Sequence, residues 1–380
     1  MISSGKDMLR LTLVAGARPN FMKIAPLIRA FGARPEVFEW RLVHTGQHYD
    51  HDMNDVFFQE LGIPAPDARL GCGGGTHATQ TAAIIIAFEK ELLANPADWV
   101  IVVGDVNSTL ACSVVASKMG VSIAHVEAGL RSGDRRMPEE INRLVTDSLS
   151  DLYFVTEPSA RENLLREGRP ARAIHDVGHV MIDNLFHQLR QLHENRNGPW
   201  THSTTRNLRD RLLASGTGYG VVTLHRPSNV DDKSALTGVL SALQTIAKTM
   251  PLVFPIHPRT RGRLEEFGIE PGPGLILTGP LPYMEFLDLW KDAALVMTDS
   301  GGLQEETSAL GVRCLTLRDT TERPITLTDG TNSLAGTNPE RIVALAGDLL
   351  SRPPSLRRPP MWDGKSAERI AAVLAAIASS

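Results

Sequence analysis

Short apolar runs alternate with longer amphipathic stretches along the chain. In the first half the runs read LRLTLVAG, EWRLVHTG, DWVIVVGD, SIAHVEAG and LYFVTE, and stretches such as MKIAPLIRAFG and ATQTAAIIIAFEKELLA separate them. The runs are rich in Val and Ile and show little polar alternation, which is typical of strands buried on both faces of a parallel sheet. This pattern predicts a doubly wound α/β domain.

The same alternation restarts in the second half. After residue 185 comes a polar stretch, QLRQLHENRNGPWTHSTTRN, followed by GYGVVTLHRP, PLVFPIHP, GLILTGP, ALVMTDSGG and RCLTLRD. We therefore expect two Rossmann-like domains, residues 1–185 and 206–360, joined by a linker at 186–205. A helix at 365–380 is expected to pack back on the first domain. Two such domains facing each other would leave a central cleft lined by the carboxyl ends of both sheets, where open α/β sheets bind ligands.

The length and composition of the chain agree with two α/β domains and give no indication of a nucleic-acid or membrane partner. The chain has 380 residues, which suits two domains, and its 42% hydrophobic and 22% charged residues are ordinary for a globular protein. A net charge of -4 gives no reason to expect a nucleic acid or an anionic membrane as partner. No apolar run has the length of a membrane helix or of a signal peptide core. Three widely spaced cysteines without metal-ligand spacing favour the cytoplasm.

The segment MTDSGGLQEE places a hydroxyl and two glycines between a predicted strand and a predicted helix. The first N–H groups of a helix have no intrahelical partner, and Ser300, Gly301 and Gly302 would let an anion approach them closely. This predicts a phosphate site, whereas the alternative is that Asp299 or Ser300 simply caps the helix. A carboxylate one or two turns further on, such as Glu306, can accept ribose hydroxyls, as acidic residues do in dinucleotide sites.

Cations and imidazoles follow other predicted strands. Arg18 and Lys23 lie near a helix start, where cations are unfavourable unless an anion binds, so we expect them to face a phosphate. His225 and Arg226 follow one strand and His257 follows the next, which favours ligand binding over a structural role. The first turn lacks a GxGxxG fingerprint, so no dinucleotide cofactor is expected, and no His, Cys and Asp set has metal-ligand spacing.

Carboxylates gather where two strands of the first domain end. Asp105 follows one strand, Glu127 follows the next, and Glu139 and Glu140 come shortly after. Crowded, partly desolvated carboxylates raise one another's pKa, which suits proton transfer near neutral pH. The alternative is structural: Asp105 caps a helix, Glu127 pairs with Arg131, and the two later glutamates favour a helix start. Both interpretations stay open at this point.

Several motifs together resemble the non-hydrolysing UDP-N-acetylglucosamine 2-epimerases of bacteria. They run in the family's order over almost the whole chain: GARPNFMKIAPL, TGQHYD, VVGDVNSTLA, HVEAGLRSGDRRMPEEINR, TLHRPSNVD, PIHPRT, TDSGGLQEE and RDTTERP. The resemblance implies a GT-B-like fold, a UDP-sugar substrate and inversion at C2 that interconverts UDP-GlcNAc and UDP-ManNAc. The implied route eliminates UDP to a 2-acetamidoglucal and adds it back, without a cofactor or metal. A homodimer is also expected.

The resemblance assigns roles residue by residue. Asp105, Glu127 and Glu139 match the acid–base carboxylates, and which of them removes the C2 proton is left open. The remaining matches are implied to bind or activate the UDP-sugar: Arg18, Lys23, Arg143, His225, Arg226, His257, Ser300, Gly301, Gly302, Glu306 and Arg323.

The chain departs from the family at two places. Asn20 stands where many members have Glu. QHYD and the arginine-free THATQTAAIII differ from the signature of the family's activator site, which leaves activation by a second substrate molecule open.

Three other functions share parts of the pattern. A hydrolysing epimerase would release UDP and free ManNAc, but the complete MPEEINR and RDTTERP segments favour the non-hydrolysing form. A GT-B glycosyltransferase shares the fold, and the carboxylates argue against it. A non-catalytic nucleotide-sugar-binding regulator would be excluded by deuterium incorporation at C2 of UDP-GlcNAc in heavy water.

Overall fold

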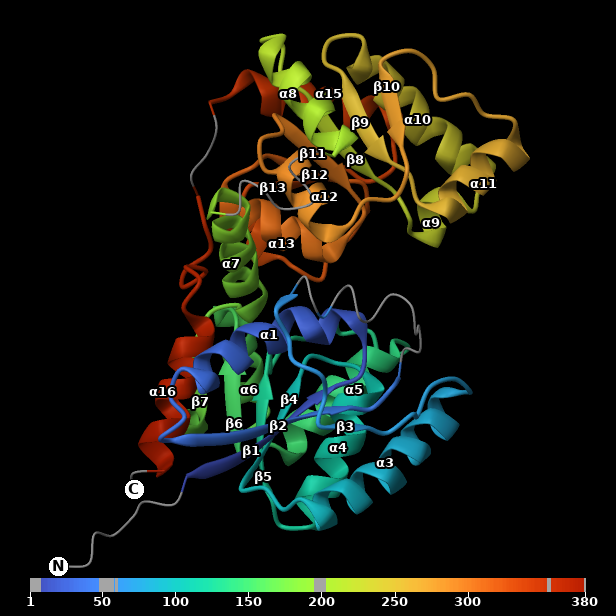
Figure 1. The fold of residues 1–380 in the computed structure, drawn as a ribbon. Coiled ribbons are helices and arrows are strands. Elements are labelled where there is room, and N and C mark those ends of the chain that lie inside the picture. The colour runs from blue at the N-terminus through green and yellow to red at the C-terminus, as the bar shows by residue number, and fades with distance from the viewer. Residues whose placement is uncertain (1–7, 48–57, 59–60, 195–202, 354–356, 379–380) are drawn as a thin grey trace, which may run out of the picture. The chain divides into compact units, whose positions relative to one another are not determined.

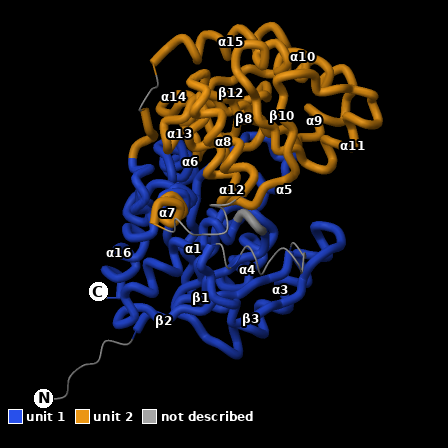
Figure 2. Tube along the Cα trace, turned by 45° about the horizontal axis from the view of Figure 1, so that its top comes forward, with its two compact units in different colours: residues 1–187, 361–380 blue, residues 188–360 orange. Residues whose placement is uncertain are grey.

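The chain forms two compact units, each built on its own parallel sheet. The computed structural model describes residues 8–378 except 48–57, 59–60, 195–202 and 354–356. The first unit holds residues 1–187 and 361–380, and the second holds residues 188–360 (Figure 2). The predicted α/β class with two doubly wound parallel sheets is confirmed.

The first unit contains a seven-stranded sheet in the order β3-β2-β1-β4-β5-β6-β7 (Figure 1). Its strands are β1 (Leu9–Ala15), β2 (Phe38–His44), β3 (Ala68–Arg69), β4 (Trp99–Val103), β5 (Ser122–Val126), β6 (Leu152–Val155) and β7 (Ile174–Asp176). All residues of β4 and β6 are buried, as expected for strands covered on both faces. The strand order reverses between β1 and β4, which is where ligands bind in folds of this type.

Helices cover both faces of this sheet. They are α1 (Arg18–Gly32), α3 (His77–Ala94), α4 (Asn107–Lys118), α5 (Pro138–Leu149), α6 (Pro158–Arg166), α7 (Val180–Glu194) and α16 (Ser366–Ala378), with a short 3₁₀ turn at Ala171–Ala173. α3, α4 and α5 pack side by side in one layer, and α1 packs against α16 in another. Residues 186–194, the first part of the predicted linker, form the C-terminal half of helix α7.

The second unit contains a six-stranded sheet in the order β10-β9-β8-β11-β12-β13. Its strands are β8 (Gly220–Thr223), β9 (Leu252–Pro255), β10 (Leu275–Thr278), β11 (Leu295–Thr298), β12 (Cys314–Thr316) and β13 (Asn332–Leu334). Its helices are α8 (Thr204–Ala214), α9 (Pro227–Val230), α10 (Lys233–Ala247), α11 (Pro258–Phe267), α12 (Tyr283–Trp290), α13 (Gly301–Leu310), α14 (Ile325–Thr328) and α15 (Pro339–Ser351). Here the order reverses between β8 and β11, which places the ends of these strands where a ligand is expected.

The C-terminal helix α16 belongs to the first unit through buried hydrogen bonds. Asp183 of α7 accepts the backbone N–H groups of Ser366 at 3.0 Å and Ala367 at 2.7 Å, so a carboxylate satisfies the start of α16. Trp362, which is 1% exposed, donates its indole N–H to the carbonyl of Thr156 at 3.1 Å. These contacts attach the C-terminal segment to the first unit.

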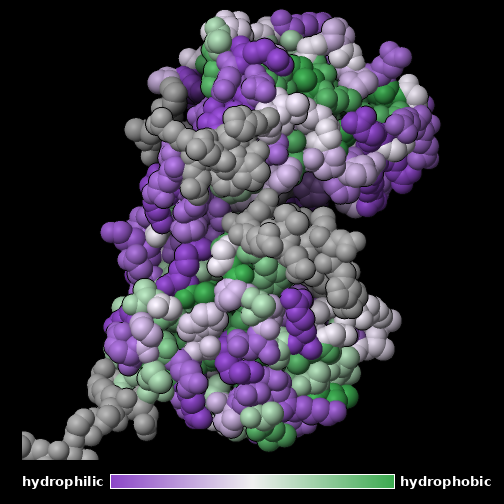
Figure 3. Space-filling model, viewed as in Figure 1, coloured by the Kyte–Doolittle hydropathy of each residue, from purple (hydrophilic) through white to green (hydrophobic). Residues whose placement is uncertain are grey.

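Hydrophilic and hydrophobic residues are mixed over the visible face of both units (Figure 3). Among the described residues, every helix is too short or too polar to cross a bilayer.

Candidate active site

The catalytic candidates of the first unit follow adjacent parallel strands. Gly104 and Asp105 come directly after β4, and Glu127 comes directly after β5, so they lie at the same edge of the sheet. Gly104 has φ 69°, which suits glycine, but Glu127 also adopts a left-handed conformation with φ 71°. A non-glycine residue in this region costs on the order of 1–2 kcal/mol. The fold tolerates this cost at a carboxylate, which points to a function for the side chain.

Glu127 forms a buried ion pair with Lys23 of α1. The two side chains are only 3% and 10% exposed. A Cβ atom on Gly104 would lie 3.3 Å from the Lys23 ammonium and 3.9 Å from the Glu127 carboxylate. Gly104 therefore leaves room for the pair beside Asp105.

Asn20 fixes the start of α1. Its Oδ1 accepts the N–H groups of Gly16 at 3.1 Å and Ala17 at 3.0 Å, and its Nδ2 donates to the carbonyl of Val103 at 3.1 Å. The residue that departs from the family pattern thus satisfies two backbone donors and ties α1 to the end of β4. Its neutral amide adds no charge next to the Lys23 pair.

Arg143 of α5 connects Asp105 with Glu140. It donates to the Asp105 carboxylate at 3.1 and 2.6 Å and to Glu140 at 2.9 Å. Glu140 also accepts the N–H groups of Ser132 at 2.9 Å and Gly133 at 3.1 Å. Burial alone would raise the pKa of Glu140, but these hydrogen bonds outweigh it and lower the pKa. The expected mutual raising of carboxylate pKa values is therefore wrong for Glu140, because a cation separates the acids.

The structural alternatives for these acids are only partly realised. Val106, rather than Asp105, stands at the N-cap of α4, and it makes no side-chain capping bond. Arg131 pairs with Asp147 and Glu167 instead of Glu127.

Glu139 does lie in the first turn of α5, where an acid is favoured. It is partly exposed, and within the described part of the chain it has no ion pair or hydrogen-bond partner.

In the second unit, the start of α13 is not capped by a side chain. Ser300 occupies the N-cap position without a side-chain capping bond. The Asp299 carboxylate turns elsewhere and accepts the N–H groups of His225 at 2.9 Å and Arg226 at 2.8 Å. A Cβ atom on Gly301 would meet nothing within 4 Å, so space remains in front of this helix start. The capping alternative is therefore wrong, and the arrangement can accept an anion.

Asp299 also orients the imidazole of His225. Its Oδ1 lies 2.9 Å from Nδ1 of His225, whose side chain is 45% exposed while Asp299 is fully buried. Burial alone would raise the pKa of Asp299, but the hydrogen bonds from His225 and the two backbone groups lower it. With Nδ1 donating to a carboxylate, Nε2 is the atom left for chemistry at the surface.

The two glutamates of α13 have separate partners. Glu306 accepts a hydrogen bond from the Tyr283 hydroxyl at 2.9 Å. The pKa of Tyr283 is raised well above its usual value, mainly by burial and further by the charge of Glu306. Glu305, which is 3% exposed, forms an ion pair with Arg323. Glu305 of α13 therefore sets the orientation of the Arg323 guanidinium.

The loop that carries Arg323 is tied to α13 and to itself. The Thr321 hydroxyl donates to the side-chain oxygen of Gln304 at 2.6 Å. Arg318 donates to both carboxylate oxygens of Glu322 at 2.9 and 2.6 Å. Burial would raise the pKa of Glu322, but Arg318 outweighs burial and lowers it to about 2.

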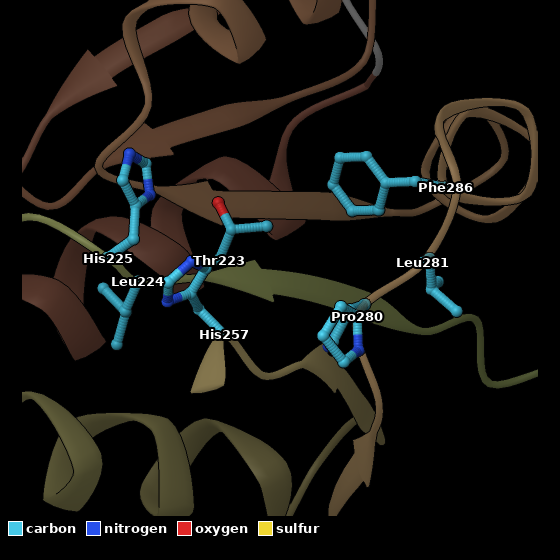
Figure 4. A pocket seen from close by; sticks show the side chains of 8 residues that line it. Thr223, Leu224, His225, His257, Pro280, Leu281 and Phe286 are labelled. Carbon is cyan, nitrogen blue, oxygen red and sulfur yellow. The ribbon is translucent and has the colours of Figure 1, made fainter. Parts of the chain in front are cut away.

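A pocket of about 200 Å³ lies at the ends of β8 and β9. Its lining residues are Thr223, Leu224, His225, Pro255, His257, Pro280, Leu281 and Phe286. The two histidines lie on one side, and the apolar residues Pro280, Leu281 and Phe286 lie on the other (Figure 4). His257 also stands at the N-cap of α11 and accepts the Arg259 N–H at 3.2 Å through Nδ1. Such a pocket suits a flat, partly polar group.

The structure brings the predicted site residues to the functional edge of each sheet. The first unit contributes Asp105, Glu127, Lys23 and Arg143, and the second contributes His225, Arg226, His257, Ser300, Gly301, Gly302, Glu306 and Arg323. Arg18 begins α1, but its side chain lies outside the described residues. Within the described ranges, no cluster of three His, Cys, Asp or Glu residues has metal-binding geometry.

Sequence reasoning missed two amide side chains that hold these edges. Asn142 donates to the carbonyl of Asp105 at 2.8 Å. Asn229 donates to Asp299 at 3.1 Å and to the carbonyl of Leu317 at 2.9 Å. Their position inside the MPEEINR and TLHRPSNVD motifs was the signal that could have identified them.

Comparisons with known proteins identify the family of the chain. Residues 30–375 match the family model described as UDP-N-acetylglucosamine 2-epimerase. UDP-N-acetylglucosamine 2-epimerase of Methanocaldococcus jannaschii is 40% identical over 372 residues, covering 96% of this chain and 99% of that protein. UDP-2,3-diacetamido-2,3-dideoxy-D-glucuronate 2-epimerase of Pseudomonas aeruginosa is 39% identical, covering 97% of this chain and 99% of that protein.

Solved structures show the same fold. The crystal structure of the M. jannaschii enzyme in complex with UDP-GlcNAc and UDP has a TM-score of 0.81 at 40% identity and covers 96% of this chain and 99% of that one. A structure of UDP-GlcNAc 2-epimerase from Neisseria meningitidis bound to UDP-GlcNAc has a TM-score of 0.80 at 26% identity and covers 96% of this chain and 99% of that one. Sequence and fold thus agree, and the chain belongs to the UDP-N-acetylglucosamine 2-epimerase family.

Proposed function

We propose that this protein is a non-hydrolysing UDP-N-acetylglucosamine 2-epimerase that interconverts UDP-GlcNAc and UDP-ManNAc. Family membership over residues 30–375 supports the reaction class. The observation that carries the proposal is the uncapped start of α13 next to the Asp299-held imidazole of His225. This edge is suited to binding a diphosphate that must leave and return.

We assign UDP binding to the second domain, residues 206–360. The N–H groups at the start of α13 accept the diphosphate, with Ser300, Gly301 and Gly302 permitting close approach. Glu306 accepts ribose hydroxyls one turn further along the helix. The pocket lined by Phe286 takes the uracil ring. His225 Nε2, Arg226, His257 and Arg323 surround the phosphates.

We assign the proton transfers to the first domain, residues 1–185. In the forward step a carboxylate takes the C2 proton, the C2–H electron pair forms the C1=C2 double bond, and the C1–O bond breaks toward the diphosphate oxygen. The return step adds that oxygen to C1 and delivers a proton to the opposite face of C2. Asp105, Glu127 and Glu139 are the candidate proton carriers. Arg143 and Lys23 offset the charges of the first two before substrate binds.

The test is to incubate the protein with UDP-GlcNAc in deuterated water and identify the products. UDP-ManNAc with deuterium at C2 is the expected result. UDP together with free ManNAc would show the hydrolysing reaction instead. No exchange at C2 and no product would remove the epimerase proposal.

A second substrate deserves the same assay because a relative with another specificity is almost equally similar. The P. aeruginosa protein named for UDP-2,3-diacetamido-2,3-dideoxy-D-glucuronate is 39% identical, against 40% for the M. jannaschii protein. We rank UDP-GlcNAc first because the matched family model carries that substrate in its description. Comparing kcat/KM for the two sugars decides between them.

We further propose a cytoplasmic homodimer. Cys72, Cys112 and Cys314 are all buried free thiols, which suits a reducing compartment. Helix α3 exposes Ile86 (57%) and Leu93 (66%) on one stripe, an apolar surface that suits a second copy of the chain.

The sequence of α3 is self-complementary about a two-fold axis. An axis between Glu89 and Lys90 places Ile86 of one copy against Leu93 of the other and Glu89 against Lys90. Light scattering checks this: Ile86→Glu should yield monomers, while Glu162→Gln on α6 should leave the dimer intact. A wild-type monomer would remove this part of the proposal.

A further inference from the structure

A fully buried histidine and aspartate lie beneath both catalytic turns of the first unit. His125 of β5 and Asp147 of α5 have side chains that are 0% exposed. His125 Nδ1 lies 2.6 Å from Asp147 Oδ1, and His125 Nε2 lies 2.8 Å from the carbonyl of Gly104. The function proposed above assigns no role to either residue.

Each end of this pair holds the backbone of a catalytic turn. Gly104, whose carbonyl accepts from His125, directly precedes Asp105. On the other side, Asp147 Oδ2 accepts the N–H of Gly129 at 3.0 Å, two residues after Glu127. The His125–Asp147 pair therefore connects the turn that carries Asp105 with the turn that carries Glu127.

The hydrogen-bond partners define the state of the ring. The carbonyl oxygen of Gly104 only accepts hydrogen bonds, so Nε2 of His125 carries hydrogen, and one further proton lies between Nδ1 and the Asp147 carboxyl group. Asp147 is itself compensated by Arg131 at 2.7 Å, and Arg131 in turn pairs with Glu167 at 2.7 Å. His125, Asp147, Arg131 and Glu167 thus form one connected polar network.

We propose that His125 and Asp147 are positioning residues that fix the relative placement of Asp105 and Glu127. Neither side chain reaches the substrate, because both are fully buried. The His125–Asp147 pair acts by holding two left-handed residues, Gly104 at φ 69° and Glu127 at φ 71°, at fixed positions relative to each other. This inference rests on the proposed epimerase function, because the two turns carry its acid–base groups.

The test compares Asp147→Asn with a matched control, Asp183→Asn. Both carboxylates are buried in the first unit and accept backbone N–H groups, but Asp183 serves α16 rather than a catalytic turn. A misplacement of about 1 Å can cost roughly a hundredfold in rate. We expect Asp147→Asn to lower kcat by roughly ten- to a hundredfold, with KM and UDP affinity within about twofold of wild type. Asp183→Asn should lower Tm without a comparable loss of kcat. Equal kcat losses in the two variants would overturn the proposal.

A second measurement needs no substrate. Long-range ¹H–¹⁵N spectra of histidine-labelled protein, assigned with His125→Gln, should show hydrogen on Nε2 of His125, which donates to the Gly104 carbonyl. A ring that carries no hydrogen on Nε2 would overturn the proposal. If wild type fails to turn over either UDP-sugar, the proposed function falls, and these spectra still decide the His125 geometry.

Discussion

Replacing Lys23 with methionine is the sharpest test of the first unit, because it removes the cation that pairs with the buried Glu127 carboxylate. Methionine keeps the length and most of the volume of the lysine side chain, so packing in α1 is preserved. Glu127 stays 3% exposed and fixed in its left-handed turn, so its carboxylate cannot easily reach water. The variant must therefore hold this carboxylate without the Lys23 charge or take up a proton.

The magnitude follows from these two options. Leaving one member of a buried ion pair alone typically costs roughly 3–5 kcal/mol. Protonating Glu127 limits this cost, because a glutamate with an ordinary pKa near 4.3 can be neutralised for about 4 kcal/mol at pH 7 and about 1 kcal/mol at pH 5. Where the carboxylate takes up this proton, the folded variant binds one proton more than the unfolded chain does above that pKa. Its destabilisation relative to wild type should grow as pH rises from 5 to 7.

Urea unfolding of wild type and Lys23→Met at pH 5 and pH 7 measures this difference. The double variant Lys23→Met/Glu127→Gln removes both charges, so its destabilisation should be the same at both pH values. Lys118→Met, at the exposed end of α4, controls for loss of a lysine and should be neutral. A loss below about 1 kcal/mol at pH 7, or one independent of pH, would refute the assignment of the pair as buried and mutually dependent.

Three further changes probe the remaining parts of the site. Asp105→Asn should abolish deuterium exchange at C2 while calorimetry finds UDP affinity unchanged; weakened UDP binding with intact turnover would contradict the assignment. Arg323→Ala should weaken UDP binding at least about tenfold, since charge-assisted hydrogen bonds contribute roughly 1.5–3 kcal/mol; retained affinity would show that Arg323 does not contact the phosphates. Glu322→Gln should destabilise the protein at pH 6 but not near pH 2. The pKa of Glu322, about 2, lies below its reference value of 4.5, so the stabilisation by Arg318 is complete above pH 4.5 and is lost as pH falls toward 2; an equal effect at both pH values in denaturant titrations would argue against this pair.

The strands and the edges that carry the site were predictable from the sequence. DWVIVVGD and SIAHVEAG are apolar runs that end in Gly104–Asp105 and Glu127, and parallel pairing of β4 and β5 places those ends together. The pairing of charges was not predictable. Lys23 precedes Glu127 by 104 residues, and Asp105 precedes Arg143 by 38, so each pair depends on how α1 and α5 pack on the sheet. Sequence proximity instead suggested Arg131 for Glu127, and packing gave Arg131 to Asp147.

The ion pairs formed within each unit bear on how the protein can recognise a diphosphate. Glu127, Asp105 and Arg323 each pair with an opposite charge from their own unit before any ligand binds, and His225 contacts the Asp299 carboxylate. A cation already engaged by a carboxylate attracts a phosphate less strongly than a solitary one, so point charges alone do not account for recognition of the diphosphate. Within the described ranges no side chain caps the N–H groups at the start of α13, and the open space at Gly301 admits an oxygen to them. On the function proposed above, directional backbone donors would position the leaving group, and the paired side chains would stabilise the charge that develops on it in the transition state.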